Sequence, residues 1–101
     1  MSEAVEMSRF TVRSEDEAVL LDAWERAITM LTSRFPGLVS ARLASLGGEE
    51  WTDVLVWESR ELAEAAAQGA SEIPEIADCF RHMFVTVHSL AEVARAVSVG
   101  P

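Results

Sequence analysis

The segment WTDVLVWES (residues 51–59) constrains the fold most, because it is a strand pattern with two apolar faces. Successive side chains of a strand point to opposite faces. A chain of 101 residues forms one domain with a modest core. Apolar side chains left in water are costly, so we expect the helices of this domain to cover one face of the strand and a second subunit to cover the other. One face carries Trp51, Asp53, Leu55 and Trp57, and the other carries Thr52, Val54, Val56 and Glu58.

Strand and helix patterns alternate along the first half of the chain. Residues 1–7 read as a loose tail, and residues 8–13 alternate like a half-buried strand. Ser14 and Glu17 fit a capping box in front of apolar residues at helical spacing, which predicts a helix from residue 15 to 33 or 34. The segments LVSARLAS and WTDVLVWE flank Gly47-Gly48, which predicts an antiparallel hairpin.

The second half predicts a helix in two pieces and a final strand. An alanine-rich helix follows its cap Ser59, and residues 69–74 interrupt it before a second helical piece. HMFVTVHS (residues 82–89) alternates again, with Phe84 and His88 on one face. Residues 90–101 form a C-terminal extension, either a short helix or a continuation of the strand. The order β-α-β-β-α-β predicts an α+β, ferredoxin-like single domain over residues 1–101, with a four-stranded antiparallel sheet.

Composition excludes several classes of protein. The net charge is -9 and the eight arginines are scattered, which argues against nucleic acid as a partner. No apolar run approaches the roughly 20 residues that span a bilayer. The single Cys79 and an acidic N-terminus without signal-peptide features lead us to expect a soluble cytoplasmic protein that needs no membrane.

Two segments resemble the antibiotic biosynthesis monooxygenase family: FPGLVSARL (residues 35–43) and WTDVLVWESRELAEAA (residues 51–66). The resemblance implies a homodimeric α+β barrel. It also implies oxidation of an anthrone-type aromatic polyketide to a quinone by molecular oxygen, without metal, flavin or other cofactor. Trp57 matches the pocket tryptophan of quinone-forming relatives, and Arg81 roughly matches a helix-two arginine. Those relatives have an asparagine where this chain has Asp53, and a helix-two tyrosine that this chain lacks.

Asp53 is the residue that core packing explains least. An ionised carboxylate between apolar neighbours is costly, so its pKa should rise unless an arginine such as Arg42 pairs with it. A raised pKa in a pocket suits proton abstraction from a phenol or an activated carbon. A structural Asp–Arg pair, or a position at a wet sheet edge, are the alternatives.

The remaining candidates are weaker. His88 is a possible proton shuttle; it lies six residues from His82, too far for one metal site on a straight strand. Cys79 lies three residues before His82, but a buried, inert thiol is the simpler reading. The candidate catalytic residues are Asp53, His88 and Arg81. The candidate substrate-binding residues are Trp57, Trp24, Phe84 and Trp51. For Trp51 and Trp57, packing in the core is the alternative to a role in binding.

Two other functions fit the same residues. An aromatic polyketide cyclase would use Asp53 and His88 for aldol acid–base chemistry in the same pocket. A non-catalytic dimeric module that binds or stabilises a ligand or partner would have Trp57 and Phe84 filling the space instead.

Overall fold

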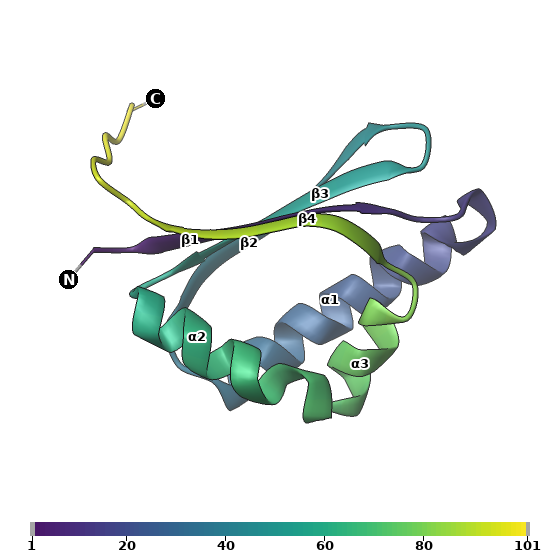
Figure 1. Cartoon of the computed structure of the whole chain (residues 1–101), viewed down its shortest axis with the longest axis horizontal. Helices are drawn as coiled ribbons and strands as arrows, with labels where there is room; N and C mark the ends of the chain where they lie inside the picture. Colours follow the sequence, from purple (N-terminus) through teal and green to yellow (C-terminus); the bar gives the residue numbers. More distant parts are fainter. Residues whose placement is uncertain (1, 101) are drawn as a thin grey trace.

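A four-stranded antiparallel sheet carries all the helices on one of its faces in the computed structural model, which describes residues 2–100 (Figure 1). The strand order across the sheet is β2-β3-β1-β4. The predicted ferredoxin-like α+β fold is confirmed. The strands are β1 (Ala4–Thr11), β2 (Leu38–Gly47), β3 (Glu50–Trp57) and β4 (Phe84–Glu92). The helices are α1 (Glu17–Arg34), α2 (Arg60–Gly69) and α3 (Pro74–Phe80), with 3₁₀ turns at Ser14–Asp16 and Ala70–Glu72.

The two predicted helix caps have different outcomes. The Ser59 hydroxyl accepts a hydrogen bond from the backbone N–H of Leu62 at 3.2 Å, so Ser59 caps α2 as predicted. The capping box at Ser14 is wrong. Ser14 begins a 3₁₀ turn, and its backbone N–H and hydroxyl both donate to the Glu49 carboxylate, at 2.7 and 3.1 Å. Ser14 therefore ties the start of the helical segment to the β2–β3 turn.

The first and last strands extend further toward the chain ends than the sequence predicts. Residues 4–7 are not a loose tail, because β1 begins at Ala4, which is fully buried and pairs with Trp57 and Glu92. At the other end β4 continues to Glu92, so the strand-continuation alternative holds for residues 90–92, and residues 93–100 contain no helix. The hairpin between β2 and β3 is as predicted, with positive φ at Gly47 and Gly48.

A β-bulge in β4 changes which of its side chains face the helices. Arg9 pairs with Val87 and Phe10 pairs with Val85, so Thr86 is an extra residue on β4. Val85 and His88 consequently lie on the inner face. The expectation that Phe84 shares a face with His88 is wrong: Phe84 is 51% exposed on the outer face, with the Arg13 guanidinium 5.7 Å from its ring centroid.

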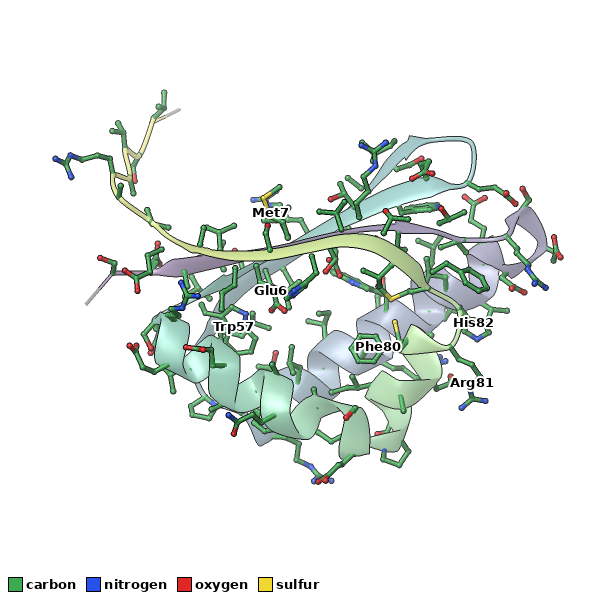
Figure 2. The ribbon with its side chains drawn as sticks, in the orientation of Figure 1. Glu6, Met7, Trp57, Phe80, Arg81 and His82 are labelled. Carbon is green, nitrogen blue, oxygen red and sulfur yellow. The ribbon has the colours of Figure 1, made fainter. Side chains whose placement is uncertain are left out.

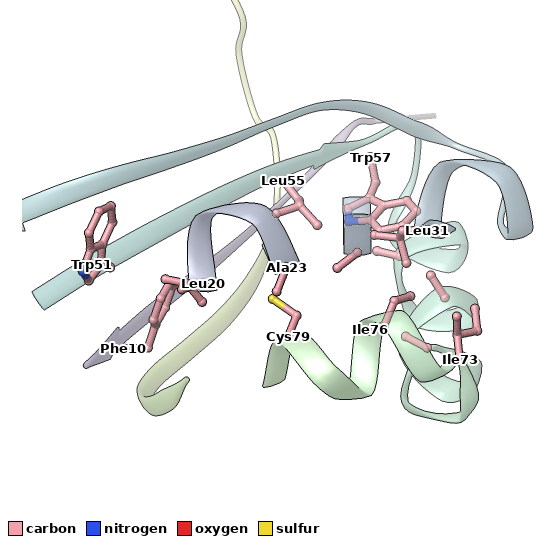
Figure 3. Close-up of a cluster of buried hydrophobic side chains, with 14 of the residues drawn as sticks. Phe10, Leu20, Ala23, Leu31, Trp51, Leu55, Trp57, Ile73, Ile76 and Cys79 are labelled. Atoms are coloured by element: carbon pink, nitrogen blue, oxygen red, sulfur yellow. The ribbon is translucent and has the colours of Figure 1, made fainter. Parts of the chain in front are cut away.

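The inner face of the sheet and the helices enclose the core (Figure 3). Along β3 every inner side chain is buried and every outer one is half-buried. Trp51 packs near Phe10 and Leu20 at one end of the core, and Trp57 lies near Leu31 at the other (Figure 3). The two tryptophans of the strand therefore belong to separate parts of the interior.

The outer face of the sheet has no helix over it and carries apolar side chains between polar ones such as Arg42. Met7 points away from the helices (Figure 2), with 46% of its surface exposed, and Val87 is 58% exposed. Val54 and Val56 on β3 are half-buried between their strand neighbours. None of the helices within residues 2–100 is long and apolar enough to cross a membrane.

Candidate functional site

A cavity of about 390 Å³ lies between the inner face of the sheet and the helices. Its size falls within the roughly 300–1,000 Å³ typical of small-molecule sites. The local sequence of α2 explains the space: Ala66 and Ala67 face it, and Ala70 follows, so this helix offers methyl groups where larger side chains would fill the gap. Leu31, Ile76, Phe80 and other apolar side chains complete most of the wall.

Asp53 belongs to the polar part of this wall. It is 8% exposed, and the indole Nε1–H of Trp24 on α1 donates to its Oδ2 at 3.2 Å. Arg42, the predicted alternative partner, pairs across the hairpin with Val54 and so lies on the outer face of the sheet. Burial raises the pKa of Asp53, the hydrogen bond from Trp24 opposes the rise, and the negative charge of Glu6 adds to it. The carboxyl group is therefore held by a hydrogen bond from a neutral indole rather than by a salt bridge.

Glu6 contacts two of the predicted site residues, Trp57 and His88, on the same wall. Its Oε1 accepts a hydrogen bond from the Nε1–H of Trp57 at 3.0 Å, and its Oε2 lies 2.8 Å from Nε2 of His88. Figure 2 shows Glu6 pointing from the sheet toward the helices. The sequence reasoning missed Glu6 because it assigned residues 1–7 to a tail. The alternation of Ala4, Glu6, Ser8 and Phe10 would have placed it on the inner face.

Four of the seven predicted site residues line the cavity: Asp53, His88, Trp57 and Trp24. Asp53 and Trp57 come from β3, His88 from β4 and Trp24 from α1, so residues distant in sequence meet at one wall.

The other three do not reach it. Trp51 is buried in the core at the far end of β3, and Phe84 lies on the outer face because of the β4 bulge. Arg81 follows the last residue of α3, points away from the cavity (Figure 2) and lies 3.5 Å from Asp78, with its side chain 72% exposed. These three residues are therefore withdrawn as site candidates.

Cys79 lines the cavity without an activating partner. Burial raises the pKa of its thiol to about 11, and its nearest polar contact is the Met83 sulfur at 3.7 Å. His82 lies in the turn before β4, 4.0 Å from Asp16, and not on a strand with His88. Across residues 2–100 no group of three His, Cys, Asp or Glu side chains is placed to hold a metal ion.

The site as a whole combines an apolar cavity with one wall that carries ionisable side chains. Asp53 has a raised pKa, and Glu6 and His88 lie 2.8 Å apart on the same wall. The indole rings of Trp24 and Trp57 line the same space. This arrangement can bind a flat apolar ligand and move a proton to or from it.

Solved structures share this fold over nearly the whole chain. SnoaB, a cofactor-independent oxygenase from Streptomyces nogalater, is 22% identical, with a TM-score of 0.77 over 96% of this chain and 97% of that one. A candidate antibiotic biosynthesis monooxygenase from Bordetella bronchiseptica is 15% identical, with a TM-score of 0.72 over 96% and 100% of the two chains. MupZ from Pseudomonas fluorescens is 13% identical, with a TM-score of 0.73 over 89% and 68%.

No protein-family model and no curated protein sequence matches the chain. At these identities the structures establish a common fold. Two of the proteins that share it are named candidate antibiotic biosynthesis monooxygenases.

The raised pKa of Asp53 predicts a pH-dependent effect of Asp53→Asn on stability. Ionising Asp53 costs more in the folded than in the unfolded chain. This cost is absent at pH values well below the ordinary value of 3.8, grows as pH rises above 3.8, and is complete once pH exceeds the raised folded-state pKa. Asparagine keeps an oxygen for the Trp24 N–H. We expect Asp53→Asn to raise the free energy of unfolding at about pH 7 and to have little effect at about pH 3.

Urea unfolding followed by circular dichroism at several pH values measures this difference. Asp22→Asn, on the exposed side of α1, is the control for the loss of one negative charge. A gain for Asp53→Asn that is the same at every pH, or that Asp22→Asn reproduces, would contradict the assignment.

Proposed function

We propose that the protein is an oxygenase that acts without a bound cofactor on an aromatic substrate of the anthrone class, converting it to a quinone. The observation that carries the proposal is the apolar cavity with the Asp53 carboxyl, of raised pKa, on its wall. Trp57 and Trp24 supply aromatic surfaces for a fused ring system. The fold shared with SnoaB, a cofactor-independent oxygenase, supports the same reading.

In the proposed mechanism the protein prepares the substrate for direct reaction with oxygen. The Asp53 carboxylate accepts a proton from the activated methylene carbon, and the anion gives one electron to O₂. The carbon radical and superoxide then combine, forming a C–O bond, and the peroxide takes up a proton, for which His88 on the same wall is the donor. Loss of water breaks the O–O bond and the second C–H bond, so methylene plus O₂ gives carbonyl plus water.

Oxygen uptake and quinone absorbance, measured on adding the protein to 1,8-dihydroxyanthrone, test this function. We expect a catalysed rate that falls by about 100-fold or more in Asp53→Ala, because general-base catalysis contributes about 10²–10⁴-fold. Trp57→Phe should also be slower, since it shortens the stacking surface and removes the N–H that Glu6 accepts.

Trp51→Phe is the matched control, being the same change on the same strand face but outside the cavity. It should keep the wild-type rate. A wild-type rate no higher than spontaneous oxidation, or an Asp53→Ala variant as fast as wild type, would overturn the oxygenase assignment.

An aromatic polyketide cyclase is the second candidate, favoured by the presence of Asp53 and the Glu6–His88 pair on one wall. A protonated Asp53 could donate to a carbonyl while His88 accepts a proton from the adjacent carbon. Turnover of a polyketide substrate without oxygen distinguishes this candidate. A non-catalytic module is less well supported, because the cavity reaches Asp53 and Phe84 does not fill it.

We also propose that a second copy of the chain covers the outer face of the sheet, giving a homodimer. The exposed or half-buried apolar side chains there are costly in water at about 25 cal/mol per Å². A two-fold dimer pairs a surface with itself, so one apolar face is sufficient to build it. The face includes Met7, Val54, Val56 and Val87.

Val87→Asp tests the dimer by placing a charge on this face. Light scattering coupled to gel filtration should give twice the 11.1 kDa chain mass for wild type and a lower mass for Val87→Asp. Val97→Asp, at a residue 84% exposed beyond the end of β4, should remain dimeric. A monomeric wild-type protein at micromolar concentration would contradict the proposal.

A further inference from the structure

The polar wall of the cavity is acidic, although one histidine lies on it. Glu6 and Asp53 both line it, and His88 is the one basic side chain among its lining residues within the described part of the chain. All eight arginines lie within residues 2–100, and none lines the cavity. Three of them lie instead beside carboxylates elsewhere, in the pairs Arg9–Glu50, Arg60–Glu64 and Arg81–Asp78.

The charges on this wall do not balance when Asp53 is ionised. His88 lies 2.8 Å from Glu6, so these two groups offset each other when the histidine is protonated. Asp53 is held by the neutral indole of Trp24. A further anion in the cavity would therefore face Asp53 at short range and in an apolar setting, where repulsion between like charges is strong.

The two indole hydrogen-bond donors on the wall are also occupied, and the lining residues offer beside them only the hydroxyls of Ser8 and Ser71 and the His88 ring, which lies against Glu6. The Trp24 N–H points at Asp53 and the Trp57 N–H points at Glu6. Both indoles donate to carboxylates of the protein itself, so neither is free to donate to a carboxylate of a ligand. Carboxyl oxygens, in contrast, can each accept more than one hydrogen bond. The wall therefore suits a ligand that brings its own donors, such as hydroxyl groups.

We propose that Glu6 and Asp53 make this cavity selective for uncharged aromatic ligands that carry hydrogen-bond donors, and that the same two groups reject analogues carrying a carboxylate. The inference rests on the proposed function only in taking a fused aromatic ring as the ligand. It narrows the substrate class to uncharged forms with donors, such as phenols and primary amides, and excludes free aromatic acids.

Binding of two ligands of the same shape tests the inference: anthracene-2-carboxamide, which is neutral, and anthracene-2-carboxylate, which is ionised at about pH 7.5. Dissociation constants come from tryptophan fluorescence quenching and from calorimetry. We expect the carboxylate to bind at least about tenfold more weakly, since desolvating and confining an anion beside another is costly. Glu6→Gln and Asp53→Asn should each reduce that ratio several-fold, because they remove one charge while keeping an oxygen for the indole N–H.

Glu58→Gln is the matched control. It removes the same charge from an exposed residue beside Trp57 that does not line the cavity, and should leave the ratio unchanged. Circular dichroism identifies any variant that fails to fold. If either Glu6→Gln or Asp53→Asn fails to fold, the binding ratio of the other variant tests the inference. If the ratio in the folded cavity variants equals that of wild type, the weaker binding of the acid comes from the apolar lining alone, and the inference is wrong.

Equal affinity of wild type for the two ligands also overturns it. These results are separable from the oxygenase assignment, which would fall if neutral anthrones bind but are not oxidised. If neither anthracene binds, the cavity is not an aromatic site, and both proposals fall together.

Discussion

The burial of one carboxyl group, Asp53, on the inner face of the sheet is the constraint on which the site depends. Its position is fixed from both sides, because β1 and β2 pair with β3 and set the register that turns Asp53 inward. Helix α1 then brings the Trp24 N–H to it, which satisfies one carboxyl oxygen without supplying a cation. An arginine there would have stabilised the carboxylate and lowered its pKa. The indole leaves the pKa raised, which suits a group that exchanges protons.

Space and polarity at the site come from different elements. The alanines of α2 leave the cavity open, whereas β1, β3 and β4 supply its carboxyl groups and its histidine. Glu6 has the central position among these strands, since it contacts Trp57 on one neighbour and His88 on the other. The sheet therefore presents its ionisable groups on its inner face, and the second subunit proposed above would cover its outer face. This separation explains how β3 can be apolar on both sides.

Local sequence patterns predicted the element order, the hairpin and the cap of α2, because each depends on residues close together in the chain. The errors arose where pairing between distant strands decides the outcome. Ala4 lies in the sheet only because Trp57 and Glu92 flank it, and so Glu6 was missed. The bulge at Thr86 is a property of the β1–β4 pairing, and it moves Phe84 out of the site while His88 stays inside. Arg81 was proposed from a resemblance alone, and the end of α3 points it to solvent.

The most direct test of the central claim, that the Asp53 cavity is the reaction site, is a crystal structure with 1,8-dihydroxyanthrone bound in the absence of oxygen. We predict that the ring system lies between the sheet and the helices, against Trp57, with a ligand oxygen or the methylene carbon within contact distance of the Asp53 carboxyl group. A ligand bound on the outer face of the sheet, or a cavity that stays empty at saturating ligand, would contradict the account.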